Sequence, residues 1–269
     1  MIAESPGADV RSLVGELTAL GVRAEQDLLV HCSLHQVGPV RDGAATVLAA
    51  LRRAAGEGAT IVVPTHTAGN SMSSRSFLAA TAGLSAAARD DYVAAMPGFD
   101  AAVSPSAGMG RLAEYVRTSP GARRSGHPQT SFAALGPCAA ECTDNHALCS
   151  HLGERSPLGW LYRAGAAVLL LGVGYAACSV FHLAEYRLPE PRRRSYRCFV
   201  MTDGKRQEYK FRAVDCVDGD FEELGEVLDN ELFVRRGQVG VADCRLLSAR
   251  DAVDFAVAWP PFRRKRAAA

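Results

Sequence analysis

The sequence predicts a globular α/β protein in which helices are layered on a buried sheet. In residues 9–64, segments with helical periodicity alternate with short apolar segments, an order typical of layered α/β domains. Residues 166–171 are apolar throughout, as expected for a buried strand. Hydrophobic residues make up 48% of the 269-residue chain, which is sufficient for a substantial core.

The N-terminal elements follow from the hydrophobic spacing. Residues 9–20 carry apolar side chains on one helical face, and Gly21 marks the expected end of this helix. Residues 27–31 predict a buried strand, residues 44–55 a second helix and residues 60–64 a second strand. The apolar positions that define the two helices are Val10, Leu13, Val14, Leu17, Leu20, Val47, Leu48 and Leu51.

The rest of the chain contains a long irregular segment and a hairpin. Residues 67–107 are rich in Ser, Ala, Gly and Pro and predict a loop, which is usually functional when it belongs to a compact domain. An Asp203-Gly204 turn between residues 198–201 and 208–211 predicts a β-hairpin. The other expected elements are helices at 110–116, 221–228 and 249–259 and strands at 132–135 and 168–171.

No internal repeat or linker interrupts the chain, so we expect a single domain over residues 1–269. Its core is expected at about residues 10–258, followed by a flexible tail at 260–269. The net charge of +1 argues against nucleic acid or a membrane as the main partner. Residues 1–6 show no secretory signal, and no apolar run approaches the ~20 residues of a membrane span, so we expect a cytoplasmic protein.

Eight cysteines are scattered along the chain, which is more typical of reduced thiols than of a disulfide framework. Cys138, Cys142 and Cys149 are interleaved with His146 and His151 and could form a metal cluster. Their spacing matches no common zinc motif, because such motifs usually begin with Cys-x2-Cys. We therefore expect no metal, and interpret these residues as small core or surface cysteines.

His182 and Glu185 form the most informative motif of the sequence. They follow the apolar segment 166–171 and the turn at 172–174. In a helix, a spacing of three residues places both side chains on one face. A carboxylate so placed can fix the imidazole tautomer and raise its basicity, which makes a general base. The spacing alone also fits a structural histidine, which is the commoner outcome.

The chain contains four segments that are weak evidence one by one, but their combination and order along the chain are specific. They are 29–34 with Val37-Gly38, then 61–65, then 123–132 with Gly136, and a fourth running from 153–158 through 169–174 to 182–185. The third contains Arg-Ser-x-His-Pro and the fourth contains His-x-x-Glu. Together with residues 237–240, these segments resemble the aminoglycoside 3-N-acetyltransferase family over about residues 10–258.

The resemblance implies a single-domain α/β/α sandwich on a mixed central sheet, distinct from the common GNAT acetyltransferase fold. It implies an acyltransferase that confers antibiotic resistance by moving an acetyl group from acetyl-coenzyme A to an aminoglycoside, at the 3-amine of its deoxystreptamine ring. The expected partners are these two small molecules, in a monomer or a homodimer. Cys32-Ser33 stands where the family often has Ser-Ser, and Cys178-Ser179 where it often has Asn-Thr. The second departure removes an amide beside the catalytic histidine and bears on substrate preference.

The resemblance also assigns the catalytic roles. His182 is the expected general base, and Glu185 orients it and supports the imidazolium. Ser179 could donate a hydrogen bond to the thioester oxygen, or it could be a turn hydroxyl bonded to the backbone. Cys178 could instead carry the acetyl group covalently, although the resemblance favours direct transfer in a ternary complex.

Coenzyme A brings phosphates, which suit backbone N–H groups at strand-to-helix turns. The resemblance assigns the turns at 31–38 and 106–110 to the cofactor cleft. Arg124 could pair with a phosphate, whereas His127 is expected to brace the fold. The expected cofactor-binding residues are His31, Ser33, Leu34, Val37, Gly38, Ser106, Gly108, Met109, Gly110 and Arg124.

A polycationic acceptor needs carboxylates, and the resemblance places acidic residues in the long loop and the C-terminal third. A single carboxylate is more often solvated surface, so this expectation depends on the acidic cluster at 215–223. The expected substrate-binding residues are Thr65, Asp100, Glu185, Asp215, Asp218 and Asp220.

Three other functions remain open from the sequence. The first is an acetyltransferase for another amine, for example in natural-product biosynthesis, and a neutral or basic cleft would favour it over the aminoglycoside. The second is a hydrolase or metalloenzyme built on the histidines and cysteines. The third is a small-molecule binding protein on the same fold, which the intact His182 and Glu185 disfavour.

Overall fold

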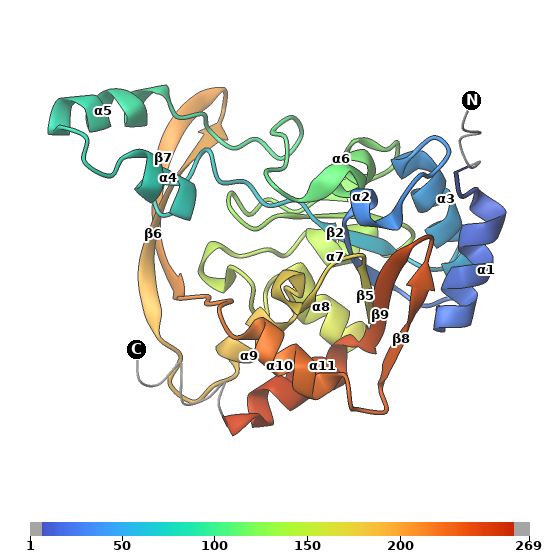
Figure 1. The fold of residues 1–269 in the computed structure, drawn as a ribbon. Helices are drawn as coiled ribbons and strands as arrows, with labels where there is room; N and C mark the ends of the chain where they lie inside the picture. Colours follow the sequence, from blue (N-terminus) through green and yellow to red (C-terminus); the bar gives the residue numbers. More distant parts are fainter. Residues whose placement is uncertain (1–6, 261–269) are drawn as a thin grey trace.

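A computed structural model describes residues 7–260. In this part of the chain, seven strands form a mixed sheet in the order β3-β4-β2-β1-β5-β9-β8 (Figure 1). Strands β2, β1 and β5 are parallel, and every other pairing is antiparallel. The strands are β1 (Leu28–Cys32), β2 (Ile61–Pro64), β3 (Arg123–Arg124), β4 (Phe132–Leu135), β5 (Ala167–Leu171), β8 (Val234–Val239) and β9 (Ala242–Ser248).

Both faces of the sheet are buried beneath helices. Successive residues of a strand point to opposite faces, so Leu28 and Val30 join one core while Leu29 joins the other. One face is covered by α1 (Val10–Leu20), α3 (Ala44–Ala55) and α6 (Gly110–Thr118). The other is covered by α7 (Ala139–Thr143), α8 (Pro157–Ala164), α9 (Phe181–Tyr186), α10 (Phe221–Leu228) and α11 (Ala249–Ala258). These three layers confirm the predicted α/β/α sandwich on a mixed sheet.

The helix and strand predictions hold closely where amphipathic spacing is strong. Helix α1 begins after Asp9, whose side chain accepts a hydrogen bond from the backbone N–H of Ser12, and it ends at Gly21 with φ of 112°. Only a residue without Cβ adopts that φ without strain. Helices α3 and α10 span the predicted residues.

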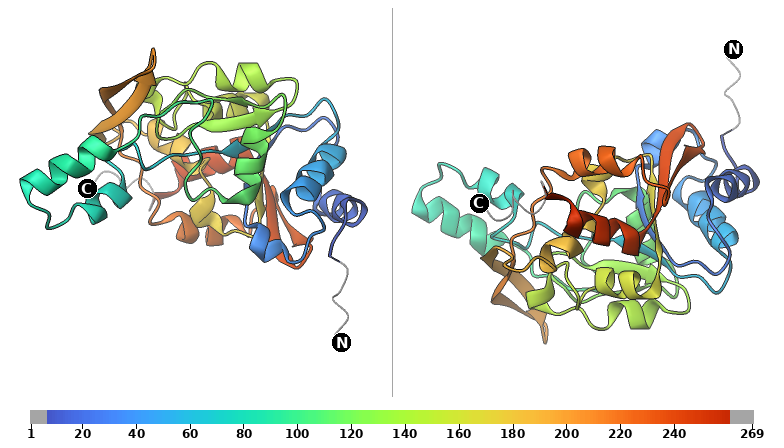
Figure 2. Two further views of the ribbon diagram at one scale, coloured as in Figure 1. Left: turned by 90° about the horizontal axis from the view of Figure 1, so that it is seen from above. Right: turned by 90° about the horizontal axis from the view of Figure 1, so that it is seen from below.

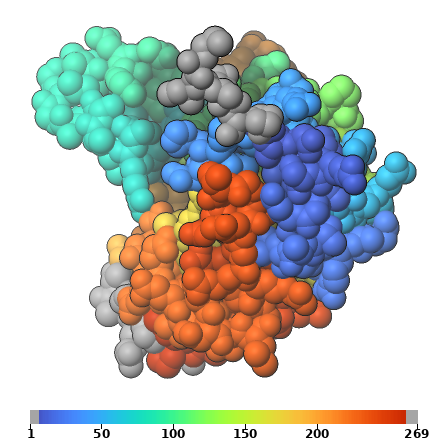
Figure 3. All heavy atoms as spheres, turned by 45° about the vertical axis from the view of Figure 1, so that its right-hand side comes forward, coloured from blue at the N-terminus to red at the C-terminus, as the bar shows by residue number. Residues whose placement is uncertain are grey.

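The prediction of a loop at 67–107 is wrong in part, because this segment contains α4 (Arg75–Ala80) and α5 (Ala86–Ala95). Ser74 and Ser85 cap these helices by accepting hydrogen bonds from the backbone N–H groups of Phe77 and Ala88. The alanines that suggested a loop are the strongest helix formers. Figure 3 shows this α4–α5 lobe (residues 75–95) standing out from the body of the molecule.

A separate β-hairpin supports the lobe. Strands β6 (Arg193–Thr202) and β7 (Lys205–Val214) pair along their full length around the predicted Asp203-Gly204 turn. Phe77 and Met96 from the lobe region pack on Phe199 of β6. The hairpin and the lobe lie at one end of the molecule, opposite α1 and α3 (Figures 1 and 2).

The β8–β9 hairpin at the edge of the sheet was not predicted, because the residues of β8 before Val239 are partly or fully exposed and lack an apolar rhythm.

Among the described residues, no helix is long and apolar enough to span a bilayer. Both the N-terminal residues 1–6 and most of the predicted flexible tail at 260–269 lie outside the described residues.

The central strands should dominate stability. Leu169 of β5 has 0% exposure, so Leu169→Ala is expected to lower the free energy of unfolding by about 2–5 kcal/mol, since a cavity remains. Urea denaturation monitored by circular dichroism measures this loss. Leu232, with 102% relative exposure, provides the control Leu232→Ala, which should change stability by less than about 0.5 kcal/mol. Similar losses in the two variants would contradict the placement of β5 in the core.

Candidate active site

A cleft of about 530 Å³ opens at the carboxyl ends of the parallel strands β2, β1 and β5. Ligands of α/β proteins commonly bind at this edge of a sheet, because loops leave several strands there side by side. The lining residues are His31, Cys32, Ser33, Leu34, His35, Pro64, His66, Gly108, Met109, Gly110, Arg111, Val173, Ala176, Ala177, Ser179, His182 and Asp218.

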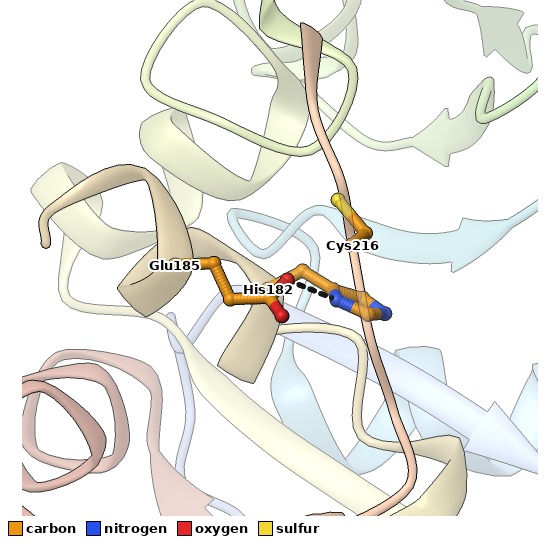
Figure 4. Close-up of side chains that lie close together, drawn as sticks. All are labelled: His182, Glu185 and Cys216. Atoms are coloured by element: carbon orange, nitrogen blue, oxygen red, sulfur yellow. Dashed lines mark hydrogen bonds and ion pairs between the residues drawn. The ribbon is translucent and has the colours of Figure 1, made fainter. Parts of the chain in front are cut away.

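His182 and Glu185 form a hydrogen-bonded pair on α9 (Figure 4). The ring Nδ1 of His182 lies 2.8 Å from Oε2 of Glu185. Since a carboxylate only accepts, Nδ1 carries the proton and Nε2 is left as the acceptor of the ring. Glu185 is 1% exposed, and its Oε1 accepts a hydrogen bond from the backbone N–H of Val217 at 2.9 Å. The pair has the arrangement of an oriented general base, and its His182 lines the cleft.

Ser179 lies beside a second histidine of the cleft. Its Oγ is 3.3 Å from Nε2 of His31, near the end of β1. Burial, together with the nearby His182, lowers the pKa of His31 to about 4. His31 is therefore an uncharged partner for the Ser179 hydroxyl at neutral pH, and both side chains line the cleft.

His66 lines the cleft as well, and the sequence analysis missed it. It follows β2 by two residues and stands edge-on to Phe132 with ring centroids 5.2 Å apart. Burial, with smaller contributions from His182 and His31, lowers the pKa of His66 to about 3. The Nε2 of His66 is buried and has no hydrogen-bond partner in the described part of the chain. Its position just past a predicted buried strand was the available signal.

Six of the ten expected cofactor-binding residues line the cleft, namely His31, Ser33, Leu34, Gly108, Met109 and Gly110. Gly110 adopts φ of 85°, and a Cβ there would lie 3.0 Å from the carbonyl oxygen of Cys32. A glycine is therefore required for this close approach of two cleft loops.

Four expected cofactor-binding residues lie outside the cleft. Val37 is 1% exposed in the core, and its carbonyl accepts from the N–H of Val241. Gly38 ends the short helix α2 (Leu34–Val37) and faces the Val241 side chain. Ser106 donates its backbone N–H and its hydroxyl to Glu114. The contacts of these three residues are made within the fold, and their assignment to coenzyme A stays a prediction.

Arg124 is the fourth, and its guanidinium is already engaged within the protein. It donates to the carbonyl oxygens of Thr65 and Ser104 and to the hydroxyl of Ser131. It also stacks over Phe99, with 5.0 Å between Cζ and the ring centroid. Burial lowers the pKa of Arg124 to about 10. These contacts brace the ends of the strands, and the assignment of Arg124 to a phosphate of coenzyme A stays a prediction.

Of the six expected substrate-binding residues, Asp218 lines the cleft. Thr65 is fully buried and bonded to the Ser131 carbonyl oxygen. Asp100 caps its own turn by accepting from Ala102, and Asp215 forms ion pairs with two arginines. Asp220 is 4% exposed at the start of α10. Glu185 bonds to His182 and Val217 and is not among the lining residues of the cleft, so its expected second role toward substrate stays a prediction.

Cys216 lies next to the His182–Glu185 pair (Figure 4), and one donor atom each from His182, Glu185 and Cys216 lies within 4.8 Å of the others. Burial and the charge of Glu185 hold the pKa of Cys216 well above its usual value. The three atoms are close enough to bind one metal ion together, whereas the Glu185 carboxylate already accepts hydrogen bonds from His182 and Val217. The cysteines and histidines at 138–151 form no such cluster within the described residues.

Cys178 is fully buried beside the cleft, and burial raises the pKa of its thiol. The thiolate is the nucleophilic form of cysteine, so this environment disfavours a covalent acyl carrier at Cys178.

Comparison with known proteins identifies the family. Residues 29–260 match the family described as aminoglycoside 3-N-acetyltransferase. The SPbeta prophage-derived aminoglycoside N(3')-acetyltransferase-like protein YokD of Bacillus subtilis (strain 168) is 34% identical over 93% of this chain and 91% of its own. Its crystal structure superposes with a TM-score of 0.87 over 95% of this chain and 94% of that one. Aminoglycoside N(3)-acetyltransferase VII of Streptomyces paromomycinus is 35% identical over 96% of this chain and 94% of its own.

Two further solved structures contain ligands. AAC-IIIb, solved as a binary complex with CoASH, is 28% identical with a TM-score of 0.82 over 94% of this chain and 96% of that one. AAC-VIa bound to sisomicin is 31% identical, with a TM-score of 0.79 over 95% of this chain and 97% of that one. The protein is thus an acyltransferase of the N-acetyltransferase class. The chain belongs to the aminoglycoside 3-N-acetyltransferase family.

Buried histidines should make the fold sensitive to acid. The pKa values of His31, His66 and His146 fall from 6.5 to about 4, 3 and 4, mainly because they are buried. Below about pH 6.5 the unfolded chain binds protons that the folded chain does not, so stability is lost as the pH falls toward 4. Each such histidine should contribute a slope of up to ~1.4 kcal/mol per pH unit.

Urea denaturation between pH 7.5 and 4.5 measures this slope. His66→Gln removes one buried imidazole without breaking a hydrogen bond at Nε2, and it should flatten the slope. The exposed His35 gives the matched control His35→Gln. Stability that is constant down to pH 5 in the unaltered protein would contradict the burial of these rings.

The covalent alternative has its own test. Cys178→Ala should retain most of the turnover, since the buried thiol takes no part in direct transfer. Steady-state kinetics and intact-mass spectrometry after exposure to acetyl-coenzyme A measure this, with the exposed Cys149→Ala as control. Abolished turnover in a folded Cys178→Ala variant, together with an acetylated unaltered enzyme, would establish the covalent route.

Proposed function

We propose that the protein transfers an acetyl group from acetyl-coenzyme A to an amine of an aminoglycoside, at the 3-amine of the deoxystreptamine ring, and so confers resistance. The observation that carries the proposal is the His182–Glu185 pair at the wall of the cleft. The CoASH complex of AAC-IIIb and the sisomicin complex of AAC-VIa support both substrates.

The donor half of the cleft fits coenzyme A. Helix α6 begins at Gly110, and the residue before it makes no side-chain capping bond to the first turn. The first N–H groups of this helix and the guanidinium of Arg111 therefore offer donors and positive charge for phosphate. Gly108 and Gly110 both have positive φ and leave room for a thin pantetheine arm.

The catalytic pair supplies the proton acceptor that amide formation needs. An aminoglycoside amine is largely protonated at neutral pH, and Nε2 of His182 can take its proton. The nitrogen lone pair then attacks the thioester carbonyl carbon, and the carbon–sulfur bond breaks as the nitrogen loses its second proton. Of the two protons that the amine gives up, one passes to the departing thiolate of coenzyme A and the other passes to solvent. Glu185 stabilises the imidazolium that exists between the two proton transfers. Ser179, held by His31, provides a hydroxyl for the oxygen of the reacting carbonyl.

A second candidate is an acetyltransferase for a less cationic amine. The observation that favours it is the scarcity of acidic side chains in the cleft, where Asp218 is the one carboxylate among the described lining residues. A panel that pairs aminoglycosides with simple amines, scored by coenzyme A thiol release and by the mass gain of one acetyl group, distinguishes the two.

The role of the pair is tested by substitution. His182→Gln should lower kcat by about 100- to 10,000-fold while acetyl-coenzyme A still binds, because the proton acceptor is lost. Glu185→Gln should lower kcat less, since the imidazole remains but its tautomer and its cationic form lose support. Steady-state kinetics and calorimetric binding of coenzyme A measure both effects. The exposed Glu226→Gln is the matched control, and near-normal turnover in His182→Gln would exclude the mechanism.

A further inference from the structure

Asp218 belongs to a short segment that serves both the catalytic pair and the cleft. The segment 215–220 joins β7 to α10 and passes beside His182 (Figure 4). The backbone N–H of Val217 holds Glu185, and the next residue, Asp218, lines the cleft. His182 and Asp218 therefore line the same cleft, in which an amine that reacts at Nε2 of His182 would bind.

The Asp218 carboxylate already forms an ion pair with an arginine of the same chain. Nη2 of Arg75 lies 2.6 Å from Oδ1 of Asp218, and Nη1 lies 3.3 Å from Oδ2. Arg75 comes from α4, in a lobe that is more than 100 residues away in the sequence. Its guanidinium thus makes a two-point contact with a carboxylate that could otherwise bind an ammonium group of the substrate.

The stability of the fold does not explain the Arg75–Asp218 pair. Exposed ion pairs contribute roughly 0–1 kcal/mol, and the Arg75 side chain is 81% exposed. The lobe is anchored independently by Phe77 and Met96 on Phe199. Arg75 is also the first residue of its helix, where a positive charge is unfavourable.

We propose that Arg75 is a specificity-determining residue that competes with the acceptor for Asp218. The proposal rests on the proposed function of the His182 cleft. The acceptor binds by cation exchange, in which its ammonium replaces the guanidinium and Arg75 moves into solvent. An acceptor that carries no positive charge next to its reacting amine cannot make this exchange, and a cationic acceptor binds less tightly than it would to an unoccupied carboxylate.

The kinetic test separates competition from a structural role. In Arg75→Ala, the KM for a cationic acceptor should fall about 2- to 5-fold, while kcat and the KM for acetyl-coenzyme A stay unchanged. Arg75→Lys keeps the charge and should stay close to the unaltered enzyme. The ion pair between Arg123 and Asp144, at 3.0 Å, lies away from the cleft and supplies the control Arg123→Ala.

An unchanged or higher acceptor KM in Arg75→Ala would overturn the proposal. A lower kcat would likewise overturn it, because Arg75 would then position the segment that holds Glu185. Asp218→Asn should weaken acceptor binding and remove the effect of Arg75→Ala in the double variant. Equal effects of Arg75→Ala with and without Asp218 would also contradict the exchange.

Calorimetric titration with sisomicin measures binding without turnover, so it tests the exchange at Asp218 independently of the proposed acetyl transfer. If sisomicin binds but is not acetylated, the proposed function fails, and the ratio of Kd values for the unaltered protein and Arg75→Ala still tests the exchange. A Kd that falls 2- to 5-fold, by about the same factor as KM, supports competition. Absence of sisomicin binding to both forms overturns the inference.

Discussion

The parallel arrangement of β2, β1 and β5 is the constraint on which the rest of the structure depends. All three strands are buried on both faces, so their backbone groups must be satisfied within the sheet and their side chains must be covered by helices. The parallel pairing brings three carboxyl ends to one edge. His31, His66 and the α9 segment therefore converge on one cleft although they are far apart in the sequence.

The Glu185 carboxylate is buried together with its hydrogen-bond partners. Glu185 is a nearly inaccessible carboxylate, and such a charge is tolerated because a histidine and a backbone N–H both bond to it. The neighbouring histidines are kept neutral by the same burial that lowers their pKa values. A low-dielectric, uncharged surrounding strengthens the interaction of Glu185 with an imidazolium at His182. Burial thus makes the fold sensitive to acid and also surrounds the His182–Glu185 pair with neutral histidines.

The sequence was most informative where one physical signal dominated. Apolar periodicity located α3, α10 and the central strands. The three-residue spacing of His182 and Glu185 predicted a shared helix face, and the two side chains are hydrogen-bonded on α9. The sequence failed where two signals competed. In α4 and α5 the alanines favour a helix, whereas the surrounding serines and glycines favour a loop. A sequence also cannot show that Arg124 donates hydrogen bonds to oxygens of Thr65, Ser104 and Ser131 within the folded protein.

Under the proposed function, the cleft has a donor half and an acceptor half. The elements that form the two halves differ in how readily their residues can be substituted. The donor half uses strand ends and the start of α6, where Gly110 is confined between two loops and a new side chain would displace the backbone. The acceptor half uses Asp218 and Arg75, from a connecting segment and from a lobe that is anchored on the β6–β7 hairpin. Exchanging exposed charges there changes stability little. Under the proposed exchange at Asp218, acceptor preference would therefore diverge through the α4–α5 lobe, while the buried sheet and the His182–Glu185 pair stay as they are.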